Sequence, residues 1–277
     1  MLIESPMSAD KSSMTPILIL GAGRMGGALI EGWALTRAFA ASDLIIRDPN
    51  PSPAALAAAK AGARLNPPDE VLAEAKTILV SVKPQVWRDA SAGLTAALNP
   101  DAVIVSIAAG VRMADLSAAF GGRPVARVMP ITAVAIGKGV ASIVCDTPVA
   151  GERARALFAP VGAAVELPSE DLMDAATAVS GSAPAYLYAF VEAMEAAAEA
   201  QGLSPQASKD LVRATMIGAA ALLDHTGAEP AELRRQVTSP NGTTEAALKV
   251  WLGEGGLMPL AAAAVEAATK RSKELAG

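Results

Sequence analysis

The stretch PILILGAGRMGGALIEGW, residues 16–33, places a short apolar run directly before three glycines and a helix-like segment. Gly21, Gly23 and Gly26 have the spacing GxGxxG. Between a strand and a helix, the first glycine permits a tight turn, the second lets a pyrophosphate approach the backbone, and the third allows close helix–strand packing. The N-terminus of the helix then faces the negative charge. The stretch predicts a dinucleotide-binding loop, and a glycine-rich turn without a ligand is the alternative.

Outward from this loop, strand-like and helix-like segments alternate as far as residue 167. Strand-like runs lie at 16–20, 44–46, 77–82, 102–107, 124–129, 140–145 and 163–167, and helix-like segments at 25–35, 53–62, 84–98 and 112–120. Such alternation predicts a mostly parallel, doubly wound sheet. We therefore expect an α/β fold with an NAD(P)-binding Rossmann-type domain at residues 15–167. Residues 1–14 lack a signal-type apolar core and are expected to form a loose N-terminal tail.

Residues 168–277 show helical patterns only, so an all-α domain is expected to follow the sheet. The helices are expected to break at Gly202, Gly227 and Pro240, and prolines 184, 205 and 230 suit first helical turns. The segment 185–200, AYLYAFVEAMEAAAEA, is apolar almost all round. Such a helix must be buried on most sides, which a small domain alone rarely achieves. We therefore predict a homodimer whose helices share one core.

Composition excludes several classes of protein. The formal net charge of −5 argues against a nucleic-acid surface, which needs clustered basic residues. The longest uncharged run, 175–191, contains Ser, Thr, Gly and Pro, so no membrane span is expected. The single cysteine, Cys145, fits a reducing cytoplasm. With His225 as the only histidine, a zinc site or a Cys–His nucleophile pair has too few ligands, and no metal is expected.

The choice of dinucleotide depends on the stretch RDPNPS, residues 47–52, at the end of the second predicted strand. Arg47 suits the 2′-phosphate of NADP, whereas Asp48 suits the ribose hydroxyls of NAD. We favour NADPH and keep NADH as the alternative. The stretches SVKPQ (81–85) and SIAAGV (106–111) follow later strands. In a doubly wound sheet, cofactor and substrate lie at such carboxyl ends.

A polar turn, TSPNGTTEAAL at residues 238–248, precedes the next helical segment. Its residues 239–244 offer hydroxyls, an amide and free backbone, but no titratable side chain. A turn that enters a helix can bind a carboxylate with backbone N–H groups, hydroxyls and the positive end of the helix dipole. The alternative is that Ser239 or Thr243 only caps the helix.

Several ordered motifs carry a family resemblance over about residues 16–275. They are GAGRMGGAL (21–29), VKPQ (82–85), SIAAGV (106–111), RVMPIT (127–132), AVSGSAPAYLYAFVEAM (178–194), LRRQVTSPNGTTEAAL (233–248) and AVEAATKRSKEL (264–275). In these motifs the chain resembles the pyrroline-5-carboxylate reductase family. The resemblance implies reduction of the cyclic imine 1-pyrroline-5-carboxylate to L-proline, the last step of proline biosynthesis, usually with NADPH. It also implies a Rossmann domain followed by a helical dimerisation and substrate-binding domain at 168–277, in a dimer or a ring of dimers.

The resemblance also implies site residues. For the cofactor they are Gly21, Gly23, Arg24, Met25 and Gly26 at the pyrophosphate, Asn66 near the adenosine phosphate, and Val82, Lys83, Pro84, Ala108, Ala109 and Gly110 toward the nicotinamide, beside the Arg47 considered above. The substrate loop would hold Ser239, Gly242, Thr243 and Thr244, and Ser182 either contacts the substrate or only starts a helix.

The reaction explains why a turn without a titratable side chain would suffice for catalysis. A cyclic imine arrives already protonated on its basic nitrogen, so the protein mainly has to bind the carboxylate, orient the ring and exclude water. Amides around Gly242–Thr244 are the expected carboxylate ligands. Thr244, with Ser239, is the expected catalytic group, and Thr244 would hydrogen-bond the ring nitrogen and relay a proton.

Three positions depart from the family pattern. Ala183 and Asn241 stand where glycine is usual, and Ile131 stands where an asparagine is usual. Ile131 supports a competing hypothesis, a non-catalytic NADP-binding regulator. A β-hydroxyacid dehydrogenase is a further alternative, but it uses a lysine early in its second domain. No lysine lies between Lys138 and Lys209.

Overall fold

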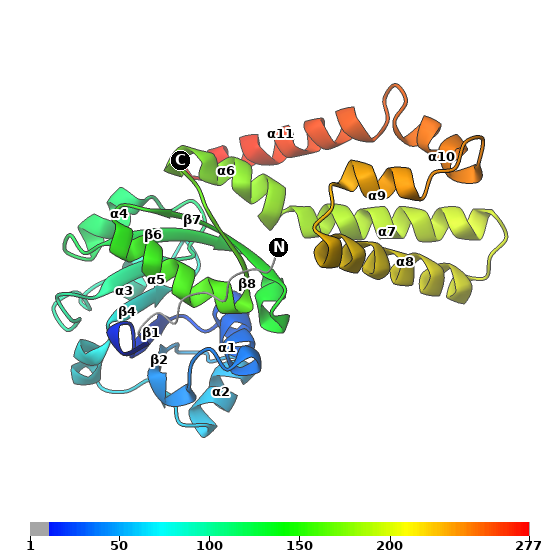
Figure 1. Ribbon diagram of the computed structural model, residues 1–277. Helices are drawn as coiled ribbons and strands as arrows, with labels where there is room; N and C mark the ends of the chain where they lie inside the picture. The colour runs from blue at the N-terminus through cyan, green and yellow to red at the C-terminus, as the bar shows by residue number, and fades with distance from the viewer. Residues whose placement is uncertain (1–10, 277) are drawn as a thin grey trace. The chain divides into compact units, whose positions relative to one another are not determined.

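The computed structural model describes residues 11–276, which form two compact units. The Rossmann unit ends at Gly181 and also takes in the chain from Thr269 onward, and the helical unit is Ser182–Ala268 (Figure 1). Of the expected tail at 1–14, residues 1–10 lie outside the described residues. Lys11–Ser13 form a 3-10 turn, η1, and Met14 is buried in the core. Thr77 Oγ1 donates to the carbonyl of Met14 at 2.7 Å, so the packing of this unit begins before residue 15.

The Rossmann unit is built on one sheet, which has eight strands within residues 11–276 and the order β3-β2-β1-β4-β5-β6-β7-β8. The strands are β1 Ile17–Leu20, β2 Leu44–Arg47, β3 Arg64–Leu65, β4 Thr77–Val80, β5 Val103–Ser106, β6 Val125–Pro130, β7 Gly139–Cys145 and β8 Gly162–Glu166. All neighbours are parallel except β6 and β7. The predicted doubly wound sheet is confirmed, and only the two-residue β3 was not expected, since it is too short to give a strand pattern.

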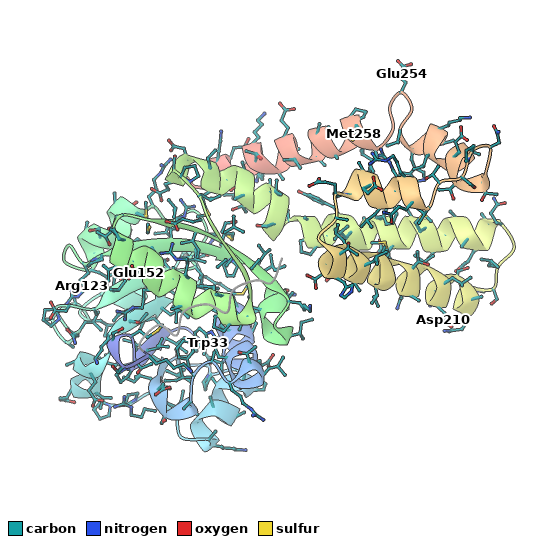
Figure 2. The ribbon with its side chains drawn as sticks, viewed as in Figure 1. Trp33, Arg123, Glu152, Asp210, Glu254 and Met258 are labelled. Atoms are coloured by element: carbon teal, nitrogen blue, oxygen red, sulfur yellow. The ribbon has the colours of Figure 1, made fainter. Side chains whose placement is uncertain are left out.

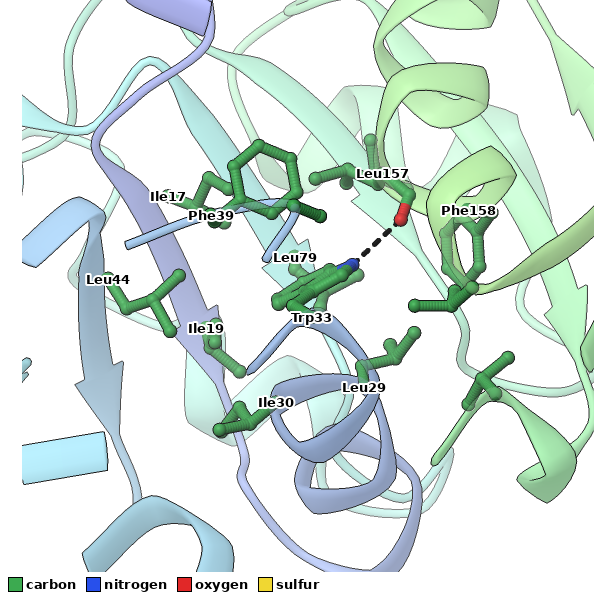
Figure 3. Packing of buried hydrophobic residues seen from close by; sticks show 14 of the residues in the cluster. Ile17, Ile19, Leu29, Ile30, Trp33, Phe39, Leu44, Leu79, Leu157 and Phe158 are labelled. Atoms are coloured by element: carbon green, nitrogen blue, oxygen red, sulfur yellow. Dashed lines mark hydrogen bonds between the residues drawn. The ribbon is translucent and has the colours of Figure 1, made fainter. Parts of the chain in front are cut away.

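Helices cover both faces of the sheet. The helices α1 (Arg24–Thr36), α2 (Pro53–Lys60) and α5 (Pro148–Phe158) pack with one set of alternating strand residues, and α3 (Trp87–Ser91), α4 (Met113–Ala119) and the 3-10 segment η3 (Asp69–Glu74) pack with the other. Trp33 of α1 is 1% exposed, and its Nε1 donates to the carbonyl of Leu157 in α5 at 2.8 Å (Figure 3). This bond fixes α1, which follows the glycine-rich loop, to its neighbour.

Two helical expectations differ from the structure. The helix α5 was not expected, although Thr147 caps it by accepting the Ala150 N–H and Pro148 opens it. The segment 84–98 was expected as one helix, but only α3 is α-helical there, and turns follow it. Gly93 has φ +76°, which an α-helix does not accommodate, and Arg123 binds the carbonyls of Thr95 and Leu98 instead (its side chain is marked in Figure 2).

The helical unit contains α7 (Ala183–Ala200), α8 (Pro205–Thr226), α9 (Pro230–Gln236), α10 (Thr243–Trp251) and most of α11 (Leu257–Ala276). The predicted breaks are confirmed: Gly202 has φ +93°, and Gly227 ends α8 in the left-handed conformation. Arg213 Nε of α8 pairs with Glu195 Oε1 of α7 at 2.7 Å. The rings of Phe190 and Trp251 join α7 to α10 at 5.4 Å between centroids.

Large apolar side chains of the helical unit stay exposed in the single chain. Leu187 is 55% exposed, Tyr188 69%, Ile217 71% and Val250 78%. Met258, at the start of α11 beyond the loop that carries Glu254, is 71% exposed (Figure 2). The helix α7, described over its whole length, has no buried residue. Apolar surface of this kind fits the expected homodimer. None of the described helices has the length and hydropathy needed to cross a bilayer.

Candidate functional site

The three glycines of the loop after β1 take the conformations that their spacing predicts. Gly21 has φ +89°, and its N–H donates to the Arg47 carbonyl at 2.8 Å. A Cβ on Gly26 would lie 2.4 Å from the Gly21 carbonyl oxygen, so this position must stay bare for the helix to approach the loop. A Cβ on Gly23 would meet nothing within 4 Å, because this glycine faces open space. The loop is therefore tight at its ends and accessible in its middle.

The helix that follows the loop begins without a side-chain cap. Gly23 is the N-cap of α1 and makes no side-chain cap bond, and the first turn holds no acidic residue. N–H groups in a first turn have no helical carbonyl partner, and the helix dipole adds positive potential there. Gly23, Arg24 and Met25 can thus present backbone donors to a pyrophosphate. The observed geometry fits a dinucleotide.

Asp48, at the end of β2, holds this loop with both carboxylate oxygens. Oδ2 accepts the Ala22 N–H at 2.5 Å, and Oδ1 accepts the Asn50 N–H at 2.7 Å. Asn66, which follows β3, pairs with the backbone of Asp48 in both directions, at 2.9 and 2.8 Å. Asp48 is only 8% exposed. Both oxygens therefore bind the protein backbone, and the side chain offers little exposed surface to ribose hydroxyls.

Arg47 lies beside Asp48, with 32% of its side chain exposed. Its Nη1 donates to the Pro67 carbonyl at 3.0 Å and lies 2.7 Å from Asp69 Oδ1. An exposed ion pair of this kind is worth at most about 1 kcal/mol, so the guanidinium can exchange this partner for another anion.

The other cofactor candidates lie at the same edge of the sheet. Val82, Lys83 and Pro84 follow β4, and Ala108, Ala109 and Gly110 follow β5. Ser81 Oγ donates to the Gly21 carbonyl, and the Ala108 N–H donates to Ser106 Oγ at 3.3 Å. Strands β1 and β4 are neighbours where the strand order reverses, which is the usual place for a ligand in such a sheet. The structure thus brings all the predicted cofactor residues to the carboxyl ends of β1–β5.

In the helical unit, the polar turn uses the Thr238 hydroxyl, which donates to the Arg234 carbonyl at 2.7 Å, but not the hydroxyls nearer α10. The N-cap is Gly242, which makes no side-chain cap bond, and its N–H donates to the Ser239 carbonyl at 3.1 Å. Within residues 11–276, the hydroxyls of Ser239, Thr243 and Thr244 make no hydrogen bond. The alternative that Ser239 or Thr243 caps this helix is therefore wrong. The N–H groups of Thr243 and Thr244 lie in the first turn, where no helical carbonyl reaches them.

Glu245 takes the place of a hydroxyl cap, and it was not among the predicted site residues. Its Oε2 accepts the N–H of Asn241 at 2.6 Å, and its Oε1 lies 3.1 Å from Lys249 Nζ. The Asn241 N–H, and then Lys249, lower the pKa of this carboxyl. Asn241 has φ +59°, a conformation that asparagine tolerates better than other non-glycine residues, which explains why it can stand where glycine is usual. A glutamate at the third helical position is the signal that could have revealed this contact.

Ser182 and Ile131, two further predicted positions, are both half-buried. Ser182 precedes α7 as its N-cap, is half-buried, and makes no side-chain cap bond. Ile131 follows β6 and is half-buried, and its N–H donates to the Val140 carbonyl at 3.1 Å. Among the described residues, no three His, Cys, Asp or Glu side chains gather closely enough to hold a metal ion. Burial, and then the charge of Glu166, raise the pKa of the Cys145 thiol.

Comparisons with known families match both parts of the chain. A family profile described as pyrroline-5-carboxylate reductase dimerisation matches residues 170–275, so the chain has the dimerisation domain that the helical pattern predicted. A second profile, described as NADP oxidoreductase coenzyme F420-dependent, matches residues 16–110, which carry the glycine-rich loop.

Whole-chain relatives agree with these profiles. A pyrroline-5-carboxylate reductase from Pseudomonas aeruginosa is 40% identical over 265 residues, covering 94% of this chain and 96% of the relative. A solved structure of a pyrroline-5-carboxylate reductase from Coxiella burnetii has a TM-score of 0.87 at 27% identity and covers 95% of this chain and 98% of its own. The Plasmodium falciparum pyrroline carboxylate reductase with NADP bound has a TM-score of 0.79 at 25% identity, with coverages of 95% and 98%. The resemblance in the sequence motifs is confirmed, and the chain belongs to the pyrroline-5-carboxylate reductase family.

Proposed function

We propose that this chain reduces 1-pyrroline-5-carboxylate to L-proline, with NADPH as the hydride donor. The observation that carries this proposal is the turn before α10, where the hydroxyls of Ser239, Thr243 and Thr244 and the first-turn N–H groups have no protein partner within the described residues. Polar groups left open beside a helix N-terminus suit a small carboxylate ligand. The reaction is proposed from the reductase relatives, and the glycine-rich loop can bind the cofactor.

The residues of the turn divide the work between binding and proton handling. The N–H groups of Thr243 and Thr244 bind the substrate carboxylate, and Gly242 lets it approach closely. The hydroxyl of Thr244 hydrogen-bonds the ring nitrogen, and Ser239 supports Thr244 in this role. The proton that the ring nitrogen already carries makes the ring an electrophilic iminium. NADPH, when bound, supplies the hydride that adds to the iminium carbon, and the C=N π electrons become the nitrogen lone pair of the amine. Ser182 is proposed as a further substrate contact.

The edge of the sheet favours NADPH over NADH. Both carboxylate oxygens of Asp48 are held by backbone N–H groups, so the usual acceptor for ribose hydroxyls is engaged. Arg47 supplies a guanidinium at the same strand end, where a 2′-phosphate can replace Asp69 as its partner. The relative from Plasmodium falciparum has NADP bound. We propose that Gly21, Gly23, Arg24, Met25 and Gly26 hold the pyrophosphate. Asn66 is proposed near the adenosine, and Val82, Lys83, Pro84, Ala108, Ala109 and Gly110 toward the nicotinamide.

We propose a cytoplasmic enzyme that assembles beyond the homodimer into a ring of dimers. The single Cys145 suits a reducing compartment. The exposed apolar side chains of α7, α8 and α10 provide the surface that a homodimer would bury. Sedimentation velocity of the purified protein distinguishes a dimer from a larger ring.

The direct test follows NADPH oxidation by the purified protein with pyrroline-5-carboxylate as the substrate. We expect saturable turnover that forms proline, and slower turnover when NADH replaces NADPH. An inactive protein that still binds NADPH in a fluorescence titration would contradict the proposed reaction but not the cofactor site.

Ile131 favours one second candidate, a non-catalytic NADP-binding regulator. This half-buried apolar residue follows β6, at the edge of the sheet where β1–β5 also have their carboxyl ends. At this position the family usually has a polar amide. A regulator would bind NADPH without turnover, whereas if Ile131 only weakens the reaction, Ile131→Asn should raise kcat/KM by about tenfold, the effect of one hydrogen bond to a charged group. Steady-state kinetics of both proteins measure this, and equal values would make Ile131 a neutral departure.

A further inference from the structure

The turn before α10 is held by a carboxylate, although it is surrounded by hydroxyls. In a common capping box, a Ser or Thr cap bonds the third helical N–H, and a Glu at that third position bonds the N–H of the cap. Here the cap is Gly242, and its own N–H already donates to the Ser239 carbonyl at 3.1 Å. Glu245, the third residue of α10, instead accepts the N–H of Asn241 at 2.6 Å.

The backbone at Asn241 and Gly242 is fixed without help from the hydroxyls of Ser239, Thr243 and Thr244. Asn241 takes a left-handed conformation, φ +59°, and its N–H is bound by Glu245. A Cβ on Gly242 would lie 2.5 Å from Ser239 Oγ and 3.0 Å from the Ser239 carbonyl oxygen, so glycine allows the turn to close. These contacts leave the hydroxyls of Ser239, Thr243 and Thr244 without a bond in the described part of the chain.

Lys249 offsets the charge that Glu245 brings to the turn. A carboxylate within one helical turn of a site for a carboxylate ligand repels that ligand. Lys249 Nζ lies 3.1 Å from Glu245 Oε1, one turn further along α10, and the pair is exposed enough to respond to salt. Glu245 therefore acts through geometry, whereas Lys249 acts through charge.

We propose that Glu245 is a positioning residue for the substrate turn and that Lys249 is its electrostatic partner. By binding the Asn241 N–H, Glu245 keeps the hydroxyls and the N–H groups of Thr243 and Thr244 available to the substrate. This inference deepens the proposed function and rests on it, because it assigns the substrate carboxylate to this turn.

The test compares steady-state kinetics of the full-length wild type with Glu245→Ala, Glu245→Gln and Lys249→Gln. Glu245→Ala removes the bond to Asn241 and should raise KM for pyrroline-5-carboxylate about tenfold while KM for NADPH stays unchanged. Glu245→Gln keeps an oxygen that accepts the same N–H, so its KM should stay near the wild-type value. Lys249→Gln leaves the carboxylate uncompensated, and its KM should rise about threefold at low salt and return toward the wild-type value at high salt.

Glu232→Ala is the matched control. Glu232 is also the third residue of its helix, α9, and it pairs with Arg235 and Gln236 there instead of binding the preceding turn. Its removal should change neither KM.

The outcomes separate this inference from the proposed function. A wild type without turnover would contradict the proposed function. If the wild type is active, two results for Glu245→Ala would overturn the positioning role. One is an unchanged KM for pyrroline-5-carboxylate, and the other is an equal loss of affinity for NADPH and substrate. A Glu245→Gln variant as impaired as Glu245→Ala would show that charge matters instead of geometry, and it would overturn the inference even if Glu245→Ala failed to fold.

Discussion

Thr244 is the residue on which the proposed proton handling depends. It is half-buried at the second position of α10, and its hydroxyl has no hydrogen bond within residues 11–276. A half-buried hydroxyl without a protein partner can donate to a ligand or accept from it. We regard Thr244 as the group that meets the ring nitrogen.

Thr244→Ala should therefore lower kcat about 100-fold, because the ring loses the hydrogen bond that orients it for hydride transfer, while NADPH binds as before. Steady-state kinetics measure kcat, and a separate NADPH titration measures the affinity for the cofactor. Thr244→Ser keeps the hydroxyl and should retain most of the activity. If the alanine variant loses turnover and NADPH affinity together, the turn has a structural role only.

At the scale of elements, the start of α8 has two serines with opposite contributions to stability, one at its N-cap and one within the helix. Ser204 caps the helix, because its Oγ accepts the Ala207 N–H at 3.2 Å. Ser208, one turn further, is fully buried, and its Oγ has no hydrogen-bond partner among residues 11–276. A satisfied cap stabilises a helix, whereas an unsatisfied buried hydroxyl destabilises the folded state.

Ser204→Ala is expected to lower the free energy of unfolding by about 1 kcal/mol. Ser208→Ala is expected to leave it unchanged or raise it by about 1 kcal/mol, since it removes an unmet polar group. Urea denaturation of both variants measures the two effects against the wild type. A loss of stability in Ser208→Ala would mean that the hydroxyl finds a partner in the native assembly.

The elements also show how far the sequence could predict this molecule. The glycine-rich loop was predictable because each glycine meets a local steric demand, which its spacing expresses directly. The turn at 94–98 was not, because the carbonyls of Thr95 and Leu98 are bound by Arg123, more than twenty residues away. A helical pattern in the sequence does not show that a distant arginine side chain will bind these carbonyls.

The candidate site divides in the same way. The hydroxyls of the turn before α10 stand out in the sequence, so its residues could be proposed as ligands. The contact of Glu245 depends on the left-handed backbone at Asn241, which the residue type permits but does not dictate. The bond from the Ala22 N–H to Asp48 could not be predicted, because it forms only when pairing of β1 with β2 brings the two strand ends together.

At the scale of the whole molecule, the exposed apolar side chains make the helical unit dependent on a partner. Ile217 on α8 is 71% exposed in the single chain. Burying one isoleucine side chain contributes about 1.5–3 kcal/mol, so a charged residue there opposes association.

Ile217→Glu should shift the purified protein toward the monomer in sedimentation velocity and lower its Tm. NADPH binding should persist, because the glycine-rich loop and its core belong to the other unit. The matched control is Leu35→Glu on α1, which is 63% exposed but lies in the Rossmann unit, and it should remain dimeric. An unchanged dimer in Ile217→Glu would place the association surface on other residues.

The attachment of Asp48 to the glycine-rich loop has a consequence for how quickly the protein can capture its cofactor. Asn66, beside the two-residue strand β3, fixes the backbone of Asp48, and Asp48 fixes Ala22 in the middle of the loop. The conformational entropy of this loop is thus lost when the sheet folds and not when the dinucleotide arrives. Capture of the cofactor becomes an encounter with a rigid template, and its speed is governed by diffusion and charge instead of by loop rearrangement.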